Sequence, residues 1–503
     1  MILNRQNLIH INPSDKLFFP ETHIFNLPEK VLQFGTGVLL RGLPDYFIDK
    51  ANREGIFNGR VAVVKSTGKG SSVEFDDQDS LYTICVRGIE GQNIIEQNII
   101  CSSISRVLTA QTQWQEILGI AASDDLEVVI SNTTEVGIQL TQDDAHACPP
   151  VSFPGKLLAI LYHRYKAYNG DPAKGLVIIP TELISDNGSR LKDIVKELSL
   201  QNALGDDFIT WLTENNTFCN SLVDRIVPGK PDEDTLKKLY DELGYHDDLL
   251  TIAEVYKLWA IEGDEKVKQA LKFYKADTGV IITPDINIYK ELKLRLLNGT
   301  HTLTCAISFL AGFPTVREAF EDEIITEFGS SLMLEEIAKS IPYPVAYDEA
   351  LKFSQNVLDR FKNPQIRHQW LSISTNYTLK LRMRVIPVLR TYFERFNAVP
   401  EHIALGFAAY LLFMKSVERN GKYFGNLGEG DYLIDDEQAI YYSELWDNNA
   451  DEAVEMALAN EDLWGQDLTK LPGFAPSVRR HLQAIADNGI MDVIRETRTK
   501  KIF

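Results

Sequence analysis

The sequence predicts an α/β N-terminal domain with a mostly parallel sheet over residues 1–284, followed by a mainly α-helical C-terminal domain over residues 285–503. In the first part, short and nearly continuous apolar runs alternate with helical segments, which is typical of parallel strands buried on both faces. From Asp285 onward, apolar residues recur with a period of about 3.6, which is typical of helices. We expect the domain boundary near Thr283-Pro284, where the pattern changes.

The composition is that of a soluble globular protein, with 44% hydrophobic and 24% charged residues, and 503 residues are too many for one ordinary core. The net charge of -20 argues against a broad surface for nucleic acid or for an anionic membrane. The cysteines are scattered, odd in number and without a C-x-x-C pair, which argues against a disulfide framework or a structural zinc site and favours a reducing cytoplasm. They are Cys85, Cys101, Cys148, Cys219 and Cys305.

Two segments bear on localisation. The N-terminus lacks a basic segment followed by an apolar core, so we expect no signal peptide. The longest uncharged apolar run, residues 403–414, is much shorter than the roughly 20 residues that span a bilayer, and we expect a buried helix there. The sequence therefore predicts a cytoplasmic protein with no membrane or nucleic-acid partner.

The first predicted strand, residues 30–34, ends in a glycine turn, and helical patterning follows it up to Asn52. This is the context of a Rossmann-type dinucleotide-binding fingerprint: Gly35 allows the tight turn and Gly37 lets the backbone approach a pyrophosphate. Leu40 stands where the third glycine is usual, and a G-x-G turn is often merely a turn. The cofactor contacts predicted here are Phe34, Gly35, Gly37, Val38 and Arg41.

The second predicted strand, residues 60–64, ends in Lys65 instead of the carboxylate that would hold the ribose of NAD. A lysine there would tolerate a 2′-phosphate, so the residues alone leave NAD and NADP open. Lys65 is a candidate cofactor contact, and a solvated strand end explains it equally well.

Polar clusters follow the next two predicted strands, residues 126–131 and 175–180. Ligands of open α/β sheets lie beyond the carboxyl ends of the strands, so these clusters are placed to touch cofactor and substrate. Either cluster alone could be turn chemistry, Asn187-Gly188 in particular. The candidate cofactor contacts of the first cluster are Asn132, Thr133 and Glu135.

The stretch 291–301 opens the second domain, and we expect it to form one helix. At roughly 100° per residue, Lys293, Asn298 and His301 fall within an arc of about 140°, between leucines that would bury the helix. Burial beside Arg295 would lower the pKa of the lysine from about 10.4, as a general acid/base requires. The alternative is a core helix with a snorkelling lysine and a hydrogen-bonded Asn and His.

Two other groups are candidates for substrate binding. A basic group in the second domain, Arg367-His368 with Lys380, Arg382 and Arg384, could bind an anionic substrate, although a solvated helix face explains such runs more often. Asp224 beside Arg225 is either a site residue or a structural ion pair. The acidic stretch 428–437 matches no calcium-loop spacing, so we expect an exposed loop and no metal.

Taken together, four motifs resemble the long-chain mannitol dehydrogenase family, in the same order and over most of the chain. They are the glycine turn from Gly35 to Arg41, Asn-Thr-Thr-Glu at 132, Val-Asp-Arg-Ile at 223, and Lys-x4-Asn-x2-His from Lys293. The last spacing is specific, whereas the glycine turn is not. Segments 30–42, 63–70 and 363–368 look most like members that act on a keto-uronate.

That resemblance implies an NAD-dependent enzyme that reduces D-tagaturonate reversibly to D-altronate without a metal, in bacterial galacturonate breakdown. It implies that Lys293 is the general acid/base, Asn298 an oxyanion-type donor and His301 a substrate-orienting partner. It further implies that Asn187 is a second oxyanion donor and that Asp224 contacts substrate hydroxyls. It also implies that a cation binds the substrate carboxylate: Lys380 is the first candidate, and Arg382 and Arg384 are the alternatives.

Other functions remain open from the sequence. A related reductase could act on fructuronate or on a neutral polyol such as mannitol. A nucleotide-sensing protein could keep the sheet without the chemistry, although the intact Lys, Asn and His spacing argues against it. A metal-dependent hydrolase would have to use the acidic stretch 428–437. The oligomeric state is not predicted.

Overall fold

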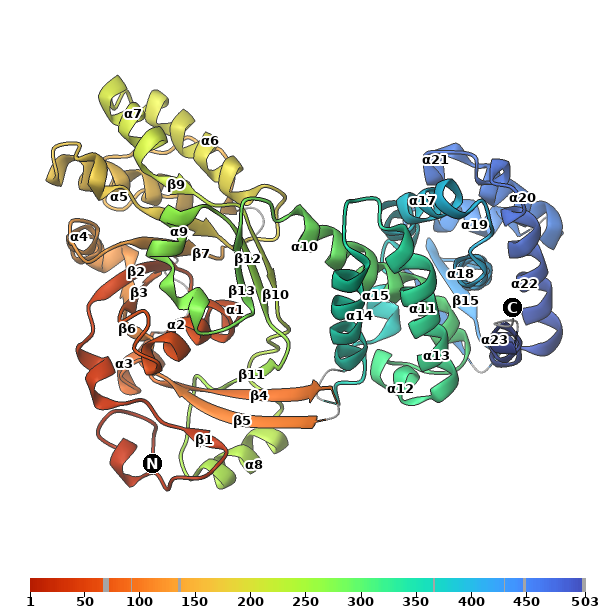
Figure 1. The fold of residues 1–503 in the computed structure, drawn as a ribbon, viewed down its shortest axis with the longest axis horizontal. Helices are drawn as coiled ribbons and strands as arrows, with labels where there is room; N and C mark the ends of the chain where they lie inside the picture. The colour runs from red at the N-terminus through yellow and green to blue at the C-terminus, as the bar shows by residue number, and fades with distance from the viewer. Residues whose placement is uncertain are drawn as a thin grey trace. The chain divides into compact units, whose positions relative to one another are not determined.

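The computed structural model describes residues 1–66, 72–91, 93–133, 137–364, 367–428, 430–446 and 449–499. The chain divides into two compact units (Figure 1). The first comprises Met1–Gly88 and Ile94–Ile286, and the second comprises Ile89–Asn93 and Asn287–Phe503.

A six-stranded parallel sheet forms the centre of the first unit, in the order β6-β3-β2-β7-β8-β9. The chain enters at β2, moves outward through β3 and β6, and then returns past β2 to build the other half. The strand order therefore reverses between β2 and β7, where sheets of this type bind their ligands. The strands are β2 (Glu29–Phe34), β3 (Arg60–Lys65), β6 (Ile104–Thr109), β7 (Val128–Ser131), β8 (Val177–Pro180) and β9 (Thr217–Phe218).

Side chains alternate across this sheet, so that each face has its own core. Val31 and Val63 belong to the core that includes α1 and α2, whereas Leu32 and Phe34 belong to the core that includes α4 to α7. Strands covered on both faces have continuous apolar runs, which is why the sequence predicted β2, β3, β7 and β8. These helices are α1 (Val38–Gly42), α2 (Pro44–Arg53), α4 (Ala110–Ala121), α5 (Phe153–Ala167), α6 (Asn187–Gln201) and α7 (Asp206–Asn215).

The helix expected after the glycine turn is broken into α1 and α2. Leu43 lies between them with φ -133° and ψ -76°, outside the helical region. Pro44 follows, and a proline has no N–H and crowds the residue before it out of the helical conformation. The break is therefore a local effect of the proline.

Two smaller sheets complete the first unit, in the orders β1-β5-β4-β11 and β10-β12-β13. Their strands are β1 (Leu17–Phe18), β4 (Tyr82–Glu90), β5 (Asn93–Cys101), β10 (Ser221–Asp224), β11 (Thr251–Glu254), β12 (Leu258–Glu262) and β13 (Val280–Thr283). The accompanying helices are α3 (Val73–Asp77), α8 (Glu233–Leu243) and α9 (Glu265–Ala270).

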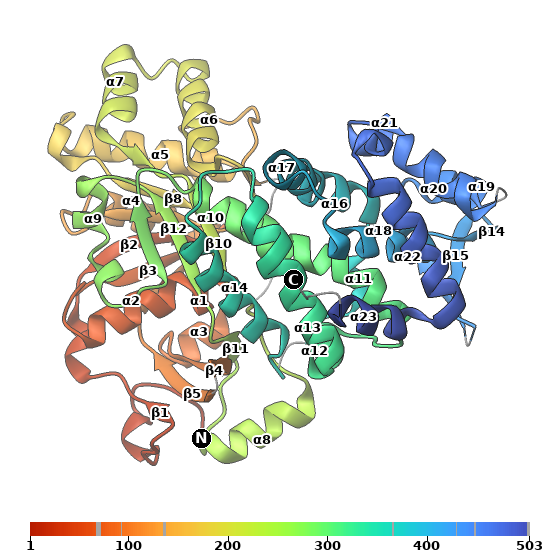
Figure 2. The same ribbon diagram turned by 45° about the vertical axis from the view of Figure 1, so that its right-hand side comes forward.

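The second unit is mainly helical, as predicted (Figures 1 and 2). All residues of α18 from Ile403 to Phe413 are buried except Leu412, and the helix packs against α11 and α22. The first helices are α10 (Asn287–Leu292), α11 (Thr300–Leu310), α12 (Val316–Glu321), α13 (Glu323–Ser331), α14 (Tyr347–Phe361), α15 (Trp370–Ile373) and α16 (Tyr377–Arg384). The others are α17 (Ile386–Phe396), α18 (Glu401–Phe413), α19 (Ala439–Leu445), α20 (Ala450–Ala459), α21 (Glu461–Trp464), α22 (Phe474–Asn488) and α23 (Ile490–Thr499).

Two expectations for this unit need correction. The stretch 291–301 is not one regular α-helix, because residues Lys293–Gly299 form a π-helix between α10 and α11. The stretch 428–437 is not simply a loop, because it contains β16 (Asp431–Ile434), which pairs with β15 (Lys422–Asn426) and through it with β14 (Val417–Arg419). None of the helices in the described ranges combines the length and the apolar character needed to cross a membrane.

Candidate functional site

The glycine turn after β2 is shaped by sterics. Gly35 has φ +124°, a region that L side chains rarely adopt, and its N–H donates to Val64 O across to β3 at 3.1 Å. A Cβ on Gly35 would lie 2.9 Å from both Asn132 O and Leu40 Cδ1, whereas a Cβ on Gly37 would meet nothing within 4 Å. The first glycine is therefore required by the fold, and the second leaves open space above the backbone.

Two of the predicted cofactor contacts point into the protein. The Arg41 guanidinium is buried, lies over the Tyr82 ring at 5.3 Å, and donates to Leu249 O. The Phe34 ring is fully buried and lies 5.0 Å from Phe153. The side chains of Phe34 and Arg41 are thus part of the protein interior next to the glycine turn. A contact of either residue with a cofactor stays a prediction.

The polar clusters after β7 and β8 are hydrogen-bonded to each other. Asn132 Nδ2 donates to Thr181 O and Oγ1, at 3.1 and 3.0 Å. The Thr133 N–H and hydroxyl both donate to Glu182 Oε1, at 2.8 and 2.9 Å. The structure therefore brings the two predicted clusters together at the carboxyl edge of the sheet, and Glu135 lies outside the described residues.

Three other predicted residues lie at the ends of strands or at the start of a helix. Lys65 ends β3 and is half-buried, and Val38 begins α1. Asp224 ends β10 and is buried. Its neighbour Arg225 is turned to backbone carbonyls, donating to Glu254 O at 2.8 Å and to Gly42 O at 2.6 Å.

Asn187 is fully engaged with the backbone. Its Nδ2 lies 3.0–3.1 Å from the carbonyls of Pro180, Glu182 and Ser221, and its Oδ1 accepts from the N–H groups of Gly188 and Ser221 at 2.9 Å. Both amide hydrogens are thus used to join the loop after β8 to β10. Donation to a substrate, which the resemblance implied, would require one of these bonds to open.

In the second unit, the π-helix changes how the three predicted catalytic residues are arranged. Its hydrogen bonds join residue i to i+5, so each turn holds more residues and Lys293 and Asn298 lie closer around the axis than the roughly 140° of a regular α-helix. His301 follows in α11, and all three side chains are half-buried. Segments of π-helix are rare and are frequently found at functional sites.

His301 is held by aromatic rings from neighbouring elements. Its imidazole stacks on Phe361 of α14 at 4.3 Å with an interplanar angle of 22°. It meets the ring of His368 at 5.6 Å and that of Trp370 at 6.1 Å, both nearly at right angles. The ring orientation is therefore fixed by packing before any substrate binds.

Two of the three predicted cations of α16 lie on the side of α11. Arg384 Nη1 donates to Thr302 Oγ1, next to His301, at 3.0 Å. Lys380 lies one helical turn earlier, donates to Ile373 O at 2.8 Å, and has its pKa lowered by burial and by Arg384. Arg382 points elsewhere, donating to Asp462 O at 2.9 Å from an exposed position. Arg384 thus contacts the residue that follows His301, Lys380 lies near Arg384 and His368, and Arg382 points elsewhere.

His368 and Arg295 join this group; the sequence placed His368 in the basic group that could bind an anionic substrate, and named Arg295 only as a neighbour of Lys293. Burial, together with Lys380, lowers the pKa of His368 below its usual value. Arg295 pairs with Glu291 at 2.8 Å and donates to Arg384 O at 2.9 Å, which ties the π-helix to the end of α16. The basic run predicted a role for His368, whereas no sequence pattern predicted that Arg295 would bond to the end of α16.

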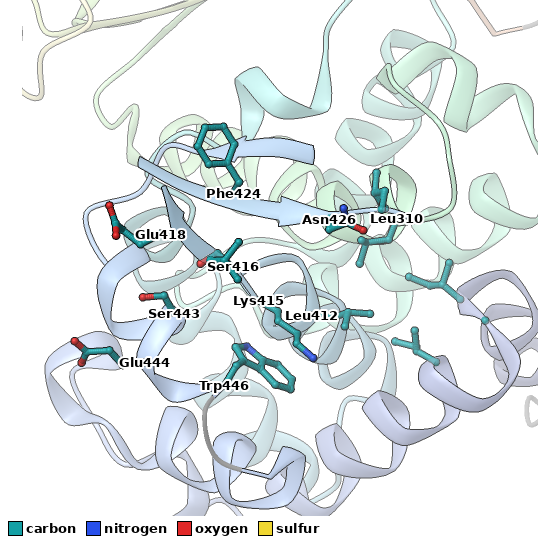
Figure 3. Close-up of a pocket in the computed structure, with 15 residues that line it drawn as sticks. Leu310, Leu412, Lys415, Ser416, Glu418, Phe424, Asn426, Ser443, Glu444 and Trp446 are labelled. Atoms are coloured by element: carbon teal, nitrogen blue, oxygen red, sulfur yellow. The ribbon is translucent and has the colours of Figure 1, made fainter. Parts of the chain in front are cut away.

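A cavity of about 810 Å³ lies elsewhere in the second unit, between β14, β15 and the last helices (Figure 3). Its lining includes Lys415, Phe424 and Trp446, and none of the predicted site residues. In the described part of the chain, no group of three or more His, Cys, Asp or Glu residues could hold a metal ion.

The parallel sheet, its strand order and the glycine turn at the point of reversal define a dinucleotide-binding domain of the Rossmann type. Residues 29–275 match the mannitol dehydrogenase Rossmann domain, and residues 285–486 match the mannitol dehydrogenase C-terminal domain. The chain therefore belongs to the mannitol dehydrogenase family, which confirms the resemblance seen in its motifs.

Relatives cover nearly the whole chain. The chain is 38% identical to the altronate oxidoreductase of Halalkalibacterium halodurans over 480 residues, 93% of each chain. It is 37% identical to the altronate oxidoreductase of Bacillus subtilis over 481 residues, 94% of this chain and 96% of that one. Its fold resembles that of Pseudomonas fluorescens mannitol 2-dehydrogenase in a ternary complex with NAD and D-mannitol, with a TM-score of 0.66, 22% identity, and coverage of 99% of this chain and 100% of that one.

Proposed function

We propose that this protein is an NAD-dependent oxidoreductase that reduces the keto group of D-tagaturonate to the hydroxyl group of D-altronate, reversibly and without a metal. Relatives named altronate oxidoreductase, which match 93–94% of the chain, support the substrate. The observation that carries the proposal is the pair of neighbouring cations Lys380 and Arg384: Arg384 contacts the residue after His301, and Lys380 lies near His368, whose ring meets that of His301. A sugar acid needs a cation for its carboxylate, whereas a neutral polyol such as mannitol does not.

The glycine turn fits a dinucleotide. Gly37 faces open space that a larger side chain would fill, and backbone N–H groups at such a turn are suited to a pyrophosphate. We propose contacts from Phe34, Gly35, Gly37, Val38, Arg41, Lys65, Asn132, Thr133 and Glu135. The solved mannitol 2-dehydrogenase complex contains NAD, which supports the same cofactor here. Because Lys65 stands where a carboxylate would select NAD, the preference over NADP needs its own experiment.

The chemistry follows from three side chains. When bound, NADH supplies the hydride that reduces the keto carbon. Negative charge then develops on the keto oxygen, and fixed donors lower such barriers, by about 10²- to 10³-fold for a single donor in oxyanion holes. We assign Asn298 and His301 to that oxygen as hydrogen-bond partners. Lys293 donates its proton to the oxygen, which leaves a hydroxyl, and takes the proton back in the reverse reaction.

The remaining residues concern substrate placement. We propose that Lys380, with Arg384 beside it, binds the uronate carboxylate and that Asp224 contacts substrate hydroxyls. Arg382 is the less favoured partner, because its guanidinium is turned to Asp462. Asn187 would act as a second donor only after releasing a backbone carbonyl.

The test is the decrease of NADH absorbance on mixing the protein with tagaturonate, fructuronate or fructose in parallel, with NADPH and chelator arms. We expect fast consumption of NADH with tagaturonate, unchanged by chelator and slower with NADPH. Faster turnover of fructuronate or fructose would replace the proposed substrate, and loss of activity in chelator would contradict the metal-free reaction.

A further inference from the structure

Asp45 of α2 is a buried carboxyl group behind the glycine turn. It is 0% exposed, and its side chain accepts a hydrogen bond from Gln33 Nε2 at 3.2 Å. Gln33 lies in β2, two residues before Gly35, and the same Nε2 approaches Gly35 O at 3.4 Å. Gln33 therefore connects Asp45 to the backbone of the turn.

Both groups keep one buried oxygen without a partner. Gln33 Oε1 and Asp45 Oδ1 are covered from solvent and accept no hydrogen bond within the described residues. Two acceptors cannot satisfy each other, and a buried acceptor without a donor is costly. A proton on Oδ1 would remove the buried negative charge and turn that oxygen into a donor, because a protonated carboxyl group is both a donor and an acceptor.

The surroundings favour the neutral form of Asp45. Burial raises the pKa of the carboxyl group to about 7, and the negative Asp49 acts in the same direction. Gln33, Arg41 and Tyr82 act against it without overcoming burial. The Arg41 guanidinium donates to Leu249 O, the Tyr82 hydroxyl donates to Arg41 O, and the nearby Cys101 thiol is neutral because burial raises its pKa.

Asp49, one turn further along α2, provides the contrast. It is equally buried, but Arg53 Nε donates to its carboxylate at 2.6 Å. The Ser102 N–H and hydroxyl also donate to it, at 2.7 and 3.0 Å. The helix thus carries one carboxylate with a bonded cation and three hydrogen bonds, and one, Asp45, with no cation of the described residues bonded to it.

We propose that Asp45 is a positioning residue that carries a proton in the folded protein and shares it with Gln33, so that a neutral acid–amide pair supports the backbone of the glycine turn. The link to cofactor binding rests on the proposed function, whereas the protonation of Asp45 does not. When Asp45 loses the proton, a negative charge appears behind the turn on which a diphosphate is expected, so NADH should bind more weakly.

The experiment compares wild type, Asp45→Asn, Asp45→Leu and Asp49→Asn in thermal unfolding and NADH titration between pH 4 and 9. Asparagine can both donate to and accept from Gln33, as the protonated acid does. Because the pKa of Asp45 is raised from about 3.9 when unfolded, wild-type stability should fall as pH rises to about 7 and be constant above it. The melting temperature of Asp45→Asn should therefore match that of wild type near pH 4 and exceed it at pH 8.

The NADH dissociation constant of wild type should rise several-fold from pH 6 to 8.5, and that of Asp45→Asn should not share this rise. Asp45→Leu should bind NADH more weakly than wild type at pH 6, and Asp49→Asn should melt below wild type throughout the neutral range.

A lower melting temperature for Asp45→Asn than for wild type at pH 8, or the same pH dependence of NADH binding in both, would overturn the inference. Should Asp45→Leu fail to fold, Asp45→Asn still decides. Absence of NADH binding to wild type would instead refute the proposed function, while the melting series would still test the proton.

Discussion

The glycine turn after β2 and the π-helix Lys293–Gly299 are both short irregularities of the backbone, but their causes differ. At the turn, Gly35 takes a positive φ where a Cβ would collide with Asn132 O. At the π-helix, the flanking residues Leu292 and Thr300 have ordinary helical angles, and the hydrogen-bond pattern between them changes. The glycine turn requires a particular residue type at one position, whereas the π-helix does not. The sequence therefore predicts the position of the glycine turn more directly than the arrangement of the proposed catalytic side chains.

The largest effect is expected in the π-helix. Lys293→Ala should lower turnover by roughly 10²-fold or more, because the keto oxygen loses its proton donor, while NADH binding remains largely intact. Steady-state kinetics and NADH titration measure the two effects separately. Lys352→Ala, at an exposed position of α14, is the matched control and should behave as wild type. Near-normal turnover of Lys293→Ala would remove the lysine from the mechanism.

The glycine turn should respond to substitution in a different way. Gly35→Ala should lower the free energy of unfolding by about 1–3 kcal/mol, the usual size of backbone strain, and more if the contacts at 2.9 Å do not relax. Gly37→Ala should leave thermal unfolding unchanged, because its Cβ meets nothing, but should weaken NADH binding. Equal melting temperatures for the two variants would contradict the steric account of the turn.

The cations of α16 offer a comparison within one helix. Lys380→Ala and Arg384→Ala should each raise KM for the uronate by about ten- to hundredfold, the usual effect of removing a charged hydrogen-bond partner. Arg382→Ala should change KM little, since its guanidinium is turned to Asp462. If Arg382→Ala proved the most damaging of the three, the assignment of the carboxylate partner would be wrong.

The smallest effect is one of pH. Burial and Arg384 lower the pKa of Lys380, so its positive charge should be lost at a lower pH than that of a free lysine. KM for the uronate should therefore begin to rise with pH below about 10.4, the ordinary lysine value. Lys380→Arg keeps its charge and should move this rise to higher pH. Identical KM profiles for wild type and Lys380→Arg would show that another group titrates.

Much of the fold was predictable from local pattern. The strands β2, β3, β7 and β8 are buried on both faces, and such strands have apolar residues at consecutive positions, which can be recognised in a sequence. The helices of the second unit were predictable from apolar residues at a period of about 3.6, because each helix buries one face. The break at Leu43 could also have been predicted, because Pro44 follows it directly.

The rest depends on contacts that sequence spacing does not contain. Nothing local shows that Arg41 turns to Leu249 O or that the amide of Asn187 is used by three carbonyls, because these partners are distant along the chain or belong to an irregular loop. The basic run on α16 was visible, but the choice between Arg382 and Arg384 needed the direction of each side chain. Assuming regular α-helix also misplaced Lys293 relative to Asn298.

The most direct test of the account is rescue of Lys293→Ala by small primary amines with tagaturonate and saturating NADH. If the lysine supplies the proton, turnover should increase with the concentration of the protonated amine, while the NADH dissociation constant stays at the wild-type value. The same amines should not accelerate Lys380→Ala turnover at saturating substrate. Lack of rescue in Lys293→Ala, in a variant shown to bind NADH normally, would contradict the role of Lys293 as the proton donor.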